Sequence, residues 1–370
     1  MPRRGAPSGS SYLWGMGELM GGGGGAVLRR RRGILLTSLG LIFFAAYLAV
    51  SNPFKALLEV GRVDLRLFLL SILINDAGLV LFAVSWYLLL RGMDVRVSVS
   101  EAIQATFISL FVVWMIPIPI GSEIIRAYLI RHKENSDIGK AVASVVVHKS
   151  MYNISFGVLI AFAAAFVSTF HGVRIPVRDD LLWFVVLFAA GSSIAFSAVL
   201  DTRLLRGVYR RSPQWIRSRL TGRLGDPRLG LDGFETVIDE IGAAVAALRS
   251  RMGLNLAAFL MVAFQWSTGS ITAWLVALSL GRRMNFWVIV VIYAVVEFIQ
   301  QLNIVIPGGL GIVDAGLTGA FVLVGVPLSL ASAISLLTRL VTYWLEVVLA
   351  GIVSIHYGYR ESLKAYLNSG

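Results

Sequence analysis

Seven polar side chains lie within or beside long apolar stretches of this 370-residue sequence, where a charge needs a partner or a function. They are Glu123, Arg126, His148 and Lys149 in the first half and Asp314, Arg339 and Tyr343 in the second. Because cations recur in both halves, the chemistry they favour is binding of an anion, and phosphate is the simplest candidate. The sequence therefore predicts a phosphate site built from these seven residues, with internal pairing that holds the chain together as the alternative.

Two interruptions rich in Pro and Gly precede these groups. Their helix-breaking residues are Pro117, Pro119 and Gly121 in the first interruption and Pro307, Gly308, Gly309 and Gly311 in the second. A proline in a helix interior removes a backbone hydrogen bond and clashes with the preceding turn. Irregular backbone at membrane depth is tolerated only where protein or a watery cavity surrounds it. We therefore expect broken or re-entrant helical hairpins over 102–130 and 286–326 whose breaks line one cavity. Pro-kinked full spans are the alternative.

Motifs typical of enzymes and metal sites are absent from the sequence. It contains no H-E-x-x-H, G-x-S-x-G or Walker motif, and its four His residues lack metal-ligand spacing. It also contains no Cys, which excludes thiolate catalysis, disulfides and Cys-ligated metals. We therefore expect a protein that is not an enzyme and that carries no cofactor and no resident metal.

The composition predicts the elements that must position these groups. Hydrophobic residues make up 57% of the chain and charged residues 15%, against about 45–50% and about 25% in globular domains. A water-soluble enzyme and a disordered chain are both excluded by this composition. Apolar runs long enough to span a membrane occur over 33–50, 65–90, 142–167, 181–200, 254–280 and 328–356. The predicted fold is an all-α polytopic membrane protein with six spanning helices plus the two hairpins.

Lys and Arg are distributed unevenly between the predicted loops. With the N-terminus inside, 24 of them fall on the cytoplasmic side and 7 on the opposite side. Because cytoplasmic loops carry the excess of Lys and Arg, both termini are predicted to be cytoplasmic, in a multi-pass protein of the cell membrane. The same rule explains the net charge of +12, so nucleic acid is not an expected partner.

The two halves of the chain repeat one pattern. Trp86 precedes Pro119 by 33 residues, and Trp274 precedes Pro307 by the same distance. A Gly that ends each Trp-bearing span and a cation in the next span recur in the same order, at offsets of 188 to 190 residues, and an acid follows each break. Because the predicted topology inserts the hairpins from opposite sides, the halves form an inverted repeat, which is common in secondary transporters.

The predicted organisation has six parts. They are a flexible basic tail (1–32), a first span with an outer loop (33–64), a first repeat (65–170), a span with a basic amphipathic cytoplasmic loop (171–252), a second repeat (253–358) and a cytoplasmic tail (359–370). In the basic loop, arginines surround Tyr209 and Trp215, a composition typical of an interfacial helix against anionic lipid. A second helix is predicted over 234–248 on the inner face of the membrane, and an ordinary connecting helix is the alternative.

Four segments are similar to a known family. They are PIPIGSEIIRAYLI, AVASVVVHKSMYN, VIPGGLGIVDAGLTGAFVLVGV and ASAISLLTRLVTYWLEVVLAGI. Over roughly residues 33–358 the chain resembles the lysylphosphatidylglycerol synthase transmembrane-region family. This is the flippase-like domain of multiple-peptide-resistance proteins, which also occurs as stand-alone bacterial and archaeal membrane proteins. The family usually has Glu-Arg where this chain has His148-Lys149, so the resemblance leaves the headgroup open.

The resemblance implies a lipid flippase or scramblase that moves an anionic phospho-headgroup lipid between leaflets. Relatives imply two cargoes, an aminoacyl-phospholipid or a polyprenyl-phosphate-linked sugar, and two protein partners, a separate lipid-modifying synthase or a glycosyltransferase. Because the aminoacyl-transferase domain is missing, synthesis of lysyl-lipid is not expected. The alternatives are a membrane-embedded transferase acting on a lipid phosphate, with His148 or Glu123 as base, and a non-transporting membrane partner of a glycosyltransferase.

Overall fold

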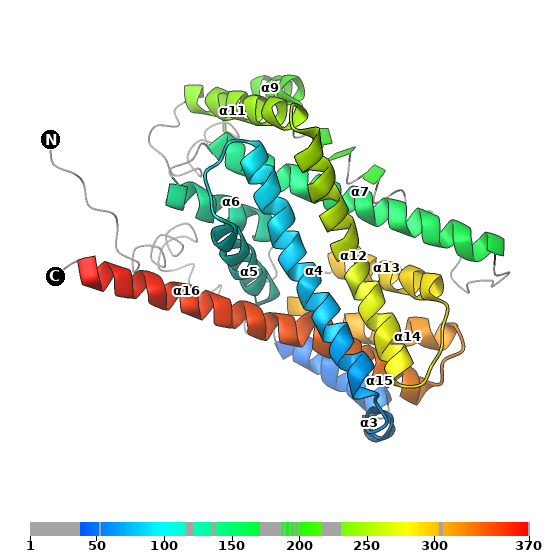
Figure 1. Cartoon of the computed structure of the whole chain (residues 1–370). Coiled ribbons are helices and arrows are strands. Elements are labelled where there is room, and N and C mark those ends of the chain that lie inside the picture. The colour runs from blue at the N-terminus through cyan, green and yellow to red at the C-terminus, as the bar shows by residue number, and fades with distance from the viewer. Residues whose placement is uncertain are drawn as a thin grey trace.

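The computed structural model describes most of the two halves that the sequence predicts. The described residues are 38–51, 53–115, 121–134, 138–170, 187, 190–191, 194–195, 197–198, 200–215, 231–302 and 306–368. Within these residues every regular element is a helix, which confirms the all-α prediction (Figure 1).

Two long helices run side by side through the middle of the molecule, α4 (Leu65–Gly92) and α12 (Met252–Ser279) (Figure 1). They are antiparallel, because Arg251, just before α12, forms an ion pair of 2.7 Å with Asp94, just after α4. At the opposite end, the residue that caps the start of α4 donates its backbone N–H to the last residue of α12. The start of each central helix is therefore joined to the end of the other.

Small side chains bring α4 and α12 together. A Cβ atom on Gly78 of α4 would overlap the side chain of Thr268 of α12. Likewise, a Cβ atom on Gly269 would overlap the ring of Tyr293. Close approach at Gly and Thr is typical of helix packing in membranes, where van der Waals contact replaces the hydrophobic effect.

Four helices are long and apolar enough to cross a membrane, and each matches a predicted span. Besides α4 and α12, they are 139–167 within α7 (Ile138–Phe170) and Leu328–Tyr357. The latter comprises α15 (Leu328–Arg339), the π-helical η2 (Leu340–Leu345) and the first part of α16 (Glu346–Asn368). These helices confirm a multi-pass membrane protein.

The predicted first span and outer loop contain two helices instead of one. The helix Ser38–Val50 is followed by α3 (Pro53–Val60), and the pair is bent by 81°. This pair is a fifth candidate span if it crosses the membrane as one unit. The predicted span over 181–200 lies largely outside the described residues.

Pairs of short helices flank both predicted breaks. In the first half, α5 (Val99–Met115) packs against α6 (Gly121–Glu134), and the residues between them, with Pro117 and Pro119, lie outside the described part of the chain. Gly121 is thus the first residue of α6. With 17 and 14 residues, both helices are shorter than the about 20 residues of a typical full span.

The second half repeats this arrangement. Helix α13 (Phe286–Leu302) packs against α14 (Ile312–Leu323), and the 3₁₀ turn η1 (Pro307–Gly309) lies between them. The stretch 286–326 is therefore two short helices folded against each other. Re-entrant placement in a membrane stays a prediction for both pairs.

Two pairs of helices in the two halves agree in length, and one of these pairs also ends in the same turn. α4 and α12 each have 28 residues, and α5 and α13 each have 17. The central helices end in the same turn, in which the backbone N–H groups of Val95 and Arg282 each bond five residues back. This turn has positive φ at Asp94 (58°) and Gly281 (77°). Asp94 is thus equivalent to Gly281, at an offset of 187 residues; the sequence pattern had matched Gly92 to Gly281.

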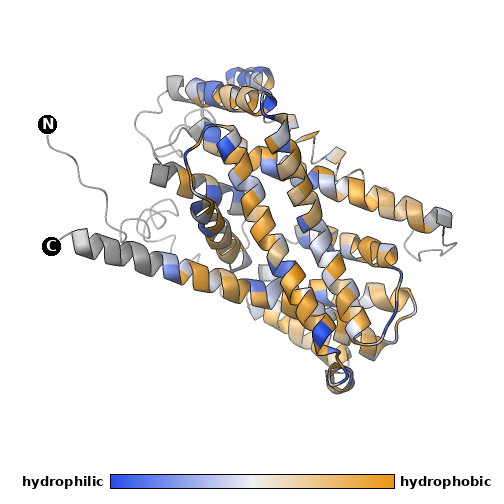
Figure 2. Cartoon of the chain, viewed as in Figure 1, coloured by the Kyte–Doolittle hydropathy of each residue, from blue (hydrophilic) through white to orange (hydrophobic). Residues whose placement is uncertain are grey.

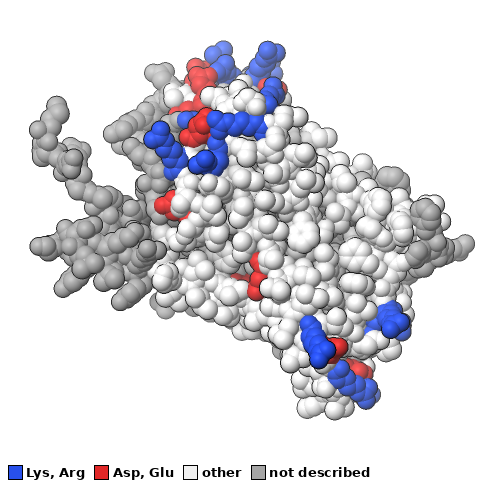
Figure 3. Space-filling view, in the orientation of Figure 1, with Lys and Arg blue, Asp and Glu red and all other residues white. Residues whose placement is uncertain are grey.

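Both helices predicted in the basic loop are present, as α9 (Thr202–Arg211) and α11 (Leu231–Arg249). They pack against each other, and Arg210 pairs with Glu235 at 3.3 Å. Figure 3 shows Lys and Arg gathered at two ends of this face, over α9 and α11 and near α3. Between these ends the surface is almost uncharged, and Figure 2 shows α4 and α12 as mostly hydrophobic there. This distribution is typical of a membrane belt.

Candidate functional site

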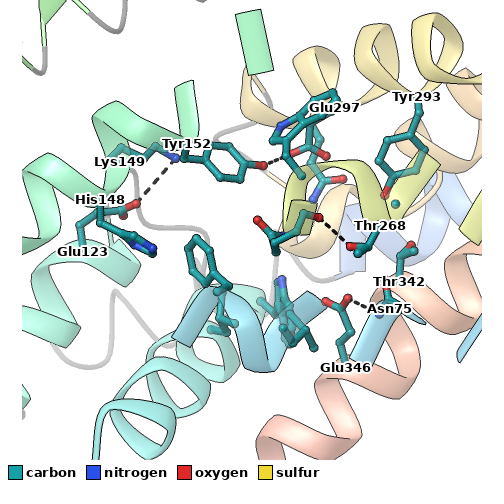
Figure 4. A pocket seen from close by; sticks show the side chains of 18 of the residues that line it. Asn75, Glu123, His148, Lys149, Tyr152, Thr268, Tyr293, Glu297, Thr342 and Glu346 are labelled. Carbon is teal, nitrogen blue, oxygen red and sulfur yellow. Dashed lines mark hydrogen bonds and ion pairs between the residues drawn. The ribbon is translucent and has the colours of Figure 1, made fainter. Parts of the chain in front are cut away.

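A cavity of about 210 Å³ lies where the two halves meet. The first half lines it with residues of α4, α5, α6 and α7, and the second half with residues of α12, α13, α15, η2 and α16 (Figure 4). Five of the seven predicted site residues line this cavity: Glu123, Arg126, His148, Lys149 and Arg339. The other two, Asp314 and Tyr343, contact Arg339.

Arg126 is held tightly in the first half. Its side chain is almost fully buried, with the guanidinium 5.3 Å from the ring of Phe82 and 5.1 Å from that of Trp86. It donates a hydrogen bond of 3.0 Å to Nδ1 of His148. Because arginine can only donate, Nδ1 carries no proton, and Nε2–H of His148 donates to Ser85 Oγ at 2.7 Å. His148 is therefore neutral in this arrangement.

Lys149 is the most open cation of this cluster. Glu123 Oε1 lies 4.0 Å from Arg126 Nη2 and 3.7 Å from Lys149 Nζ, so one carboxylate serves two cations. The Lys149 side chain is 27% exposed and that of Arg126 only 2%. The ammonium also lies 4.9 Å from the centre of the Tyr152 ring. Because its ammonium group is partly exposed and lines the cavity, Lys149 can contact a ligand there without a rearrangement of the surrounding side chains.

Arg339 holds the second break together. Its Nε lies 3.4 Å from Asp314 Oδ1, Nη2 donates to the carbonyl of Gly308, and the guanidinium lies 4.5 Å from the Tyr343 ring centre. Asp314 in turn accepts a hydrogen bond of 2.9 Å from the N–H of Gly311 at the start of α14. The acid and the cation behind this break thus bind its backbone.

Glycines permit the shape of the second break. Gly308, Gly309 and Gly311 have φ of 58°, 64° and 79°, a region that strongly favours glycine. Space adds a second requirement, because a Cβ on Gly308 would overlap the Tyr343 ring. A Cβ on Gly311 would overlap the backbone of the helix Ser38–Val50. The glycines of the P-G-G-L-G element are therefore needed for close packing as well as for the helix break.

Two acids of the cavity were not among the predicted site residues. Glu297 on α13 accepts a hydrogen bond of 3.2 Å from the Tyr152 hydroxyl, and Glu346 on α16 accepts one of 2.7 Å from Asn75 (Figure 4). Within the described ranges neither carboxylate forms an ion pair. The signal that could have found them is their presence in apolar helices, which marks an ionisable residue as functional.

Polar atoms without partners also line the cavity. Nε1 of Trp266, a residue only 3% exposed, donates to no described acceptor, and Oε1 of Gln265 accepts from no described donor. Buried polar groups are almost always hydrogen-bonded, so their presence here indicates a cavity adapted to a polar occupant.

Long apolar helices around a buried, charged cavity define a polytopic membrane protein with an internal polar site. The chain belongs to the family described as the lysylphosphatidylglycerol synthase TM region, whose model matches residues 33–350. It is 25% identical over 307 residues to a UPF0104 membrane protein of Pyrococcus horikoshii, which covers 79% of this chain and 87% of the relative. Two UPF0104 membrane proteins of Methanothermobacter thermautotrophicus are 24% and 21% identical, over 78% and 89% of this chain and 83% and 96% of their own lengths.

Proposed function

We propose that this protein moves a lipid with an anionic, phosphate-bearing headgroup between the leaflets of the cell membrane, as a flippase or scramblase with both termini cytoplasmic. The observation that carries the proposal is the charged cavity at the meeting of the two halves, to which cations from both contribute. A headgroup that crosses the bilayer needs such a polar site, because a bare charge at the centre costs several kcal/mol.

An inverted repeat of the two halves is part of this proposal. It is supported by the antiparallel central helices, the equal helix lengths and the offset of 187 residues from Leu65 to Met252 and from Val99 to Phe286. Two similar halves of opposite orientation can exchange roles, which gives inward-open and outward-open states of similar energy. Helices beside the breaks, α5, α6 and α13, contribute residues to the cavity wall, as expected for such transporters. Pro307, Gly308, Gly309 and Gly311 of the second break, which were predicted to line the cavity, are not among the described residues of its wall.

Lys149 is the first contact for the headgroup phosphate in this proposal. It is the most exposed of the three cations that line the cavity, whereas Arg126 and Arg339 are already held by His148 and by the second break. A lysine acts as a mobile point charge for phosphate, and its reach of several bonds suits a ligand that must also leave.

Transport is favoured over the alternative of phosphate transfer by the state of the two candidate bases. The unprotonated nitrogen of His148 accepts a hydrogen bond from Arg126 and is not free to take a proton from a substrate. The carboxylate of Glu123 lies within 4.0 Å of two cations, an arrangement that favours a structural anion over a base.

The proposal defines the cargo by its phosphate group alone. An aminoacyl-phospholipid and a polyprenyl-phosphate-linked sugar share this group, and both suit a cavity with cations and hydrogen-bonding side chains. A separate lipid-modifying synthase or glycosyltransferase would supply the cargo as a protein partner.

The test is leaflet exchange by the purified protein in liposomes that contain fluorescent phosphatidylglycerol. When the protein is present, we expect a membrane-impermeant quencher to extinguish almost all of the label, because labelled lipid moves from the inner to the outer leaflet. When the protein is absent, the quencher should extinguish only the label that was in the outer leaflet from the start. Mass spectrometry of the same lipid is expected to find it unchanged. A new covalent product without exchange would support the transferase instead.

A further inference from the structure

The described residues in and next to the cavity contain more carboxylates than cations. The cations are Arg126, Lys149 and Arg339, and the carboxylates are Glu123, Asp314, Glu297 and Glu346. Glu123 and Asp314 lie within 4.0 Å of cations. Glu297 and Glu346 accept hydrogen bonds from neutral donors alone, Tyr152 and Asn75. The excess negative charge of the site therefore lies on these last two side chains.

The groups that act on these two acids come from every element packed around them. Lys149 and Tyr152 of α7, Tyr293 of α13 and Arg339 of α15 face Glu297. Asp76 and Asn75 of α4, Arg339 and Glu297 itself act on Glu346. Figure 4 shows Asn75 beside it. The nearest cations are thus shared with Glu123 and Asp314, and Asp76 adds further negative charge. None of these groups forms an ion pair with either acid among the described residues.

An anionic headgroup would make this imbalance worse. Its phosphate would enter a site that already holds more carboxylates than cations, even before Asp76 is counted. In surroundings of low dielectric an uncompensated charge is strongly disfavoured, and a carboxylate relieves it most simply by binding a proton. A bound metal ion is less suited, because no group of three or more His, Asp or Glu in the described ranges could hold one.

We propose that Glu297 and Glu346 form a proton site, and that binding of the phosphate headgroup is coupled to uptake of one proton by this pair. The inference rests on the proposed function and names its coupling ion. The proton comes from water on the side where the headgroup enters, adds to a carboxylate oxygen, and leaves to water with the lipid on the other side. No bond of the lipid is made or broken. An anion and a proton then cross together, so that the loaded cavity carries no added charge.

Calorimetry on the detergent-solubilised full chain tests the coupling directly. The probe is dihexanoyl-phosphatidylglycerol, titrated in two buffers of different ionisation enthalpy, which reports protons taken up per lipid bound. We expect about one proton per lipid, and an affinity that falls by up to about tenfold per pH unit as the pH rises. Binding with no proton uptake would overturn the proposal and leave lipid transport standing.

The double variant Glu297→Gln/Glu346→Gln keeps one acceptor oxygen at each position, for Tyr152 and Asn75, and removes both negative charges. We expect it to take up no proton and to bind the lipid with an affinity that no longer depends on pH. The matched control is Glu59→Gln, whose carboxylate pairs with the exposed Arg62 outside the cavity and should leave proton uptake unchanged. Undiminished uptake in the double variant would contradict the assignment of these two residues.

Two further arms separate the remaining explanations. Dihexanoyl-phosphatidylethanolamine carries its own ammonium group and should bind with less proton uptake than the glycerol lipid; equal uptake would contradict the charge-balance argument. Replacing sodium by choline at fixed pH should change nothing, and an affinity that follows sodium would overturn the choice of the proton. If liposome exchange fails while proton-linked binding persists, the function is wrong and the proton site stands.

Discussion

An acid followed by a cation lies behind each of the two breaks, but the two ion clusters contact different groups. They are Glu123 with Arg126 and Lys149 in the first half, and Asp314 with Arg339 in the second. In the second half, Arg339 and Asp314 bind the backbone of the break itself, at Gly308 and Gly311. In the first half, Arg126 binds His148 and two aromatic rings.

This difference indicates that Arg339 and Lys149, which match in the repeat pattern, have different functions. In the second half, the Arg339 side chain is only 5% exposed, and its contacts are to Asp314, the carbonyl of Gly308 and the Tyr343 ring. Lys149, its counterpart in the repeat pattern, is 27% exposed and faces the cavity. We infer that the second cluster mainly stabilises the fold, whereas the first mainly contacts the ligand. The two halves thus share the order of acid and cation, whereas the contacts that these residues make differ.

The largest effect is expected from Arg339→Ala. This change leaves Asp314, which is 1% exposed, as a buried charge without its cation, and removes the donor to Gly308. Breaking a buried pair in this way costs about 3–5 kcal/mol. We expect a large loss of thermal stability in detergent, measured by intrinsic fluorescence. The control is Lys149→Ala, for which we expect a smaller loss, because the Lys149 side chain is 27% exposed and Glu123 keeps Arg126 as a second cation at 4.0 Å. Equal losses at the two positions would abolish the distinction drawn above.

A somewhat smaller loss is expected from Gly311→Ala. The new Cβ meets the backbone of the neighbouring helix Ser38–Val50 at a φ of 79°. Strain of about 1–2 kcal/mol from the left-handed backbone adds to an overpacking cost of about 1–3 kcal/mol. Gly319→Ala, within α14, is the matched control, because a Cβ atom at that position has no neighbouring atom within 4 Å. Size-exclusion profiles after heating should separate the two; a Gly311→Ala protein as stable as the control would show that the break is not closely packed.

The smallest effect on stability, but a clear effect on exchange, is expected from Lys149→Ala. Loss of one charge-assisted contact to phosphate weakens headgroup binding by about 1.5–3 kcal/mol, which is roughly tenfold to more than a hundredfold. Lys149→Arg keeps the charge and should retain most of the activity. Calorimetry with short-chain phosphatidylglycerol measures the change. An unchanged affinity in the alanine variant would move the ligand contact to Arg126 or Arg339.

Much of the fold could be predicted from the sequence because apolar length and helix breakers are local signals. The helices α4, α7 and α12, the break at Pro307–Gly311 and the two helices of the basic loop follow from them. The bend before α3 could not be predicted, because residues 53–60 form a separate short helix whose angle depends on what it packs against. The offsets read from Trp, Pro, Gly and cation identities exceed 187 by one to three residues, because residue identities were matched where the shared feature is a turn conformation at Asp94 and Gly281.

The site was predicted only in part, for a different reason. Sequence identifies which ionisable groups lie in apolar helices, and five of the seven chosen residues do line one cavity. It does not say which charges are already paired across the fold. The pair of Arg339 with Asp314 and the isolation of Glu297 and Glu346 depend on contacts between helices far apart in the chain.

Passage of the headgroup through the cavity is tested most directly by blocking it. The chain contains no cysteine, so Thr342→Cys places one thiol on the cavity wall, to be modified with a bulky charged thiosulfonate reagent. The control is Ser267→Cys, because Ser267, like Thr342, donates to the carbonyl four residues earlier but does not line the cavity. We predict that modification reduces liposome exchange by the Thr342→Cys protein to the protein-free rate and leaves the control unaffected. Full exchange by Thr342→Cys protein that mass spectrometry shows to be completely modified would contradict the account.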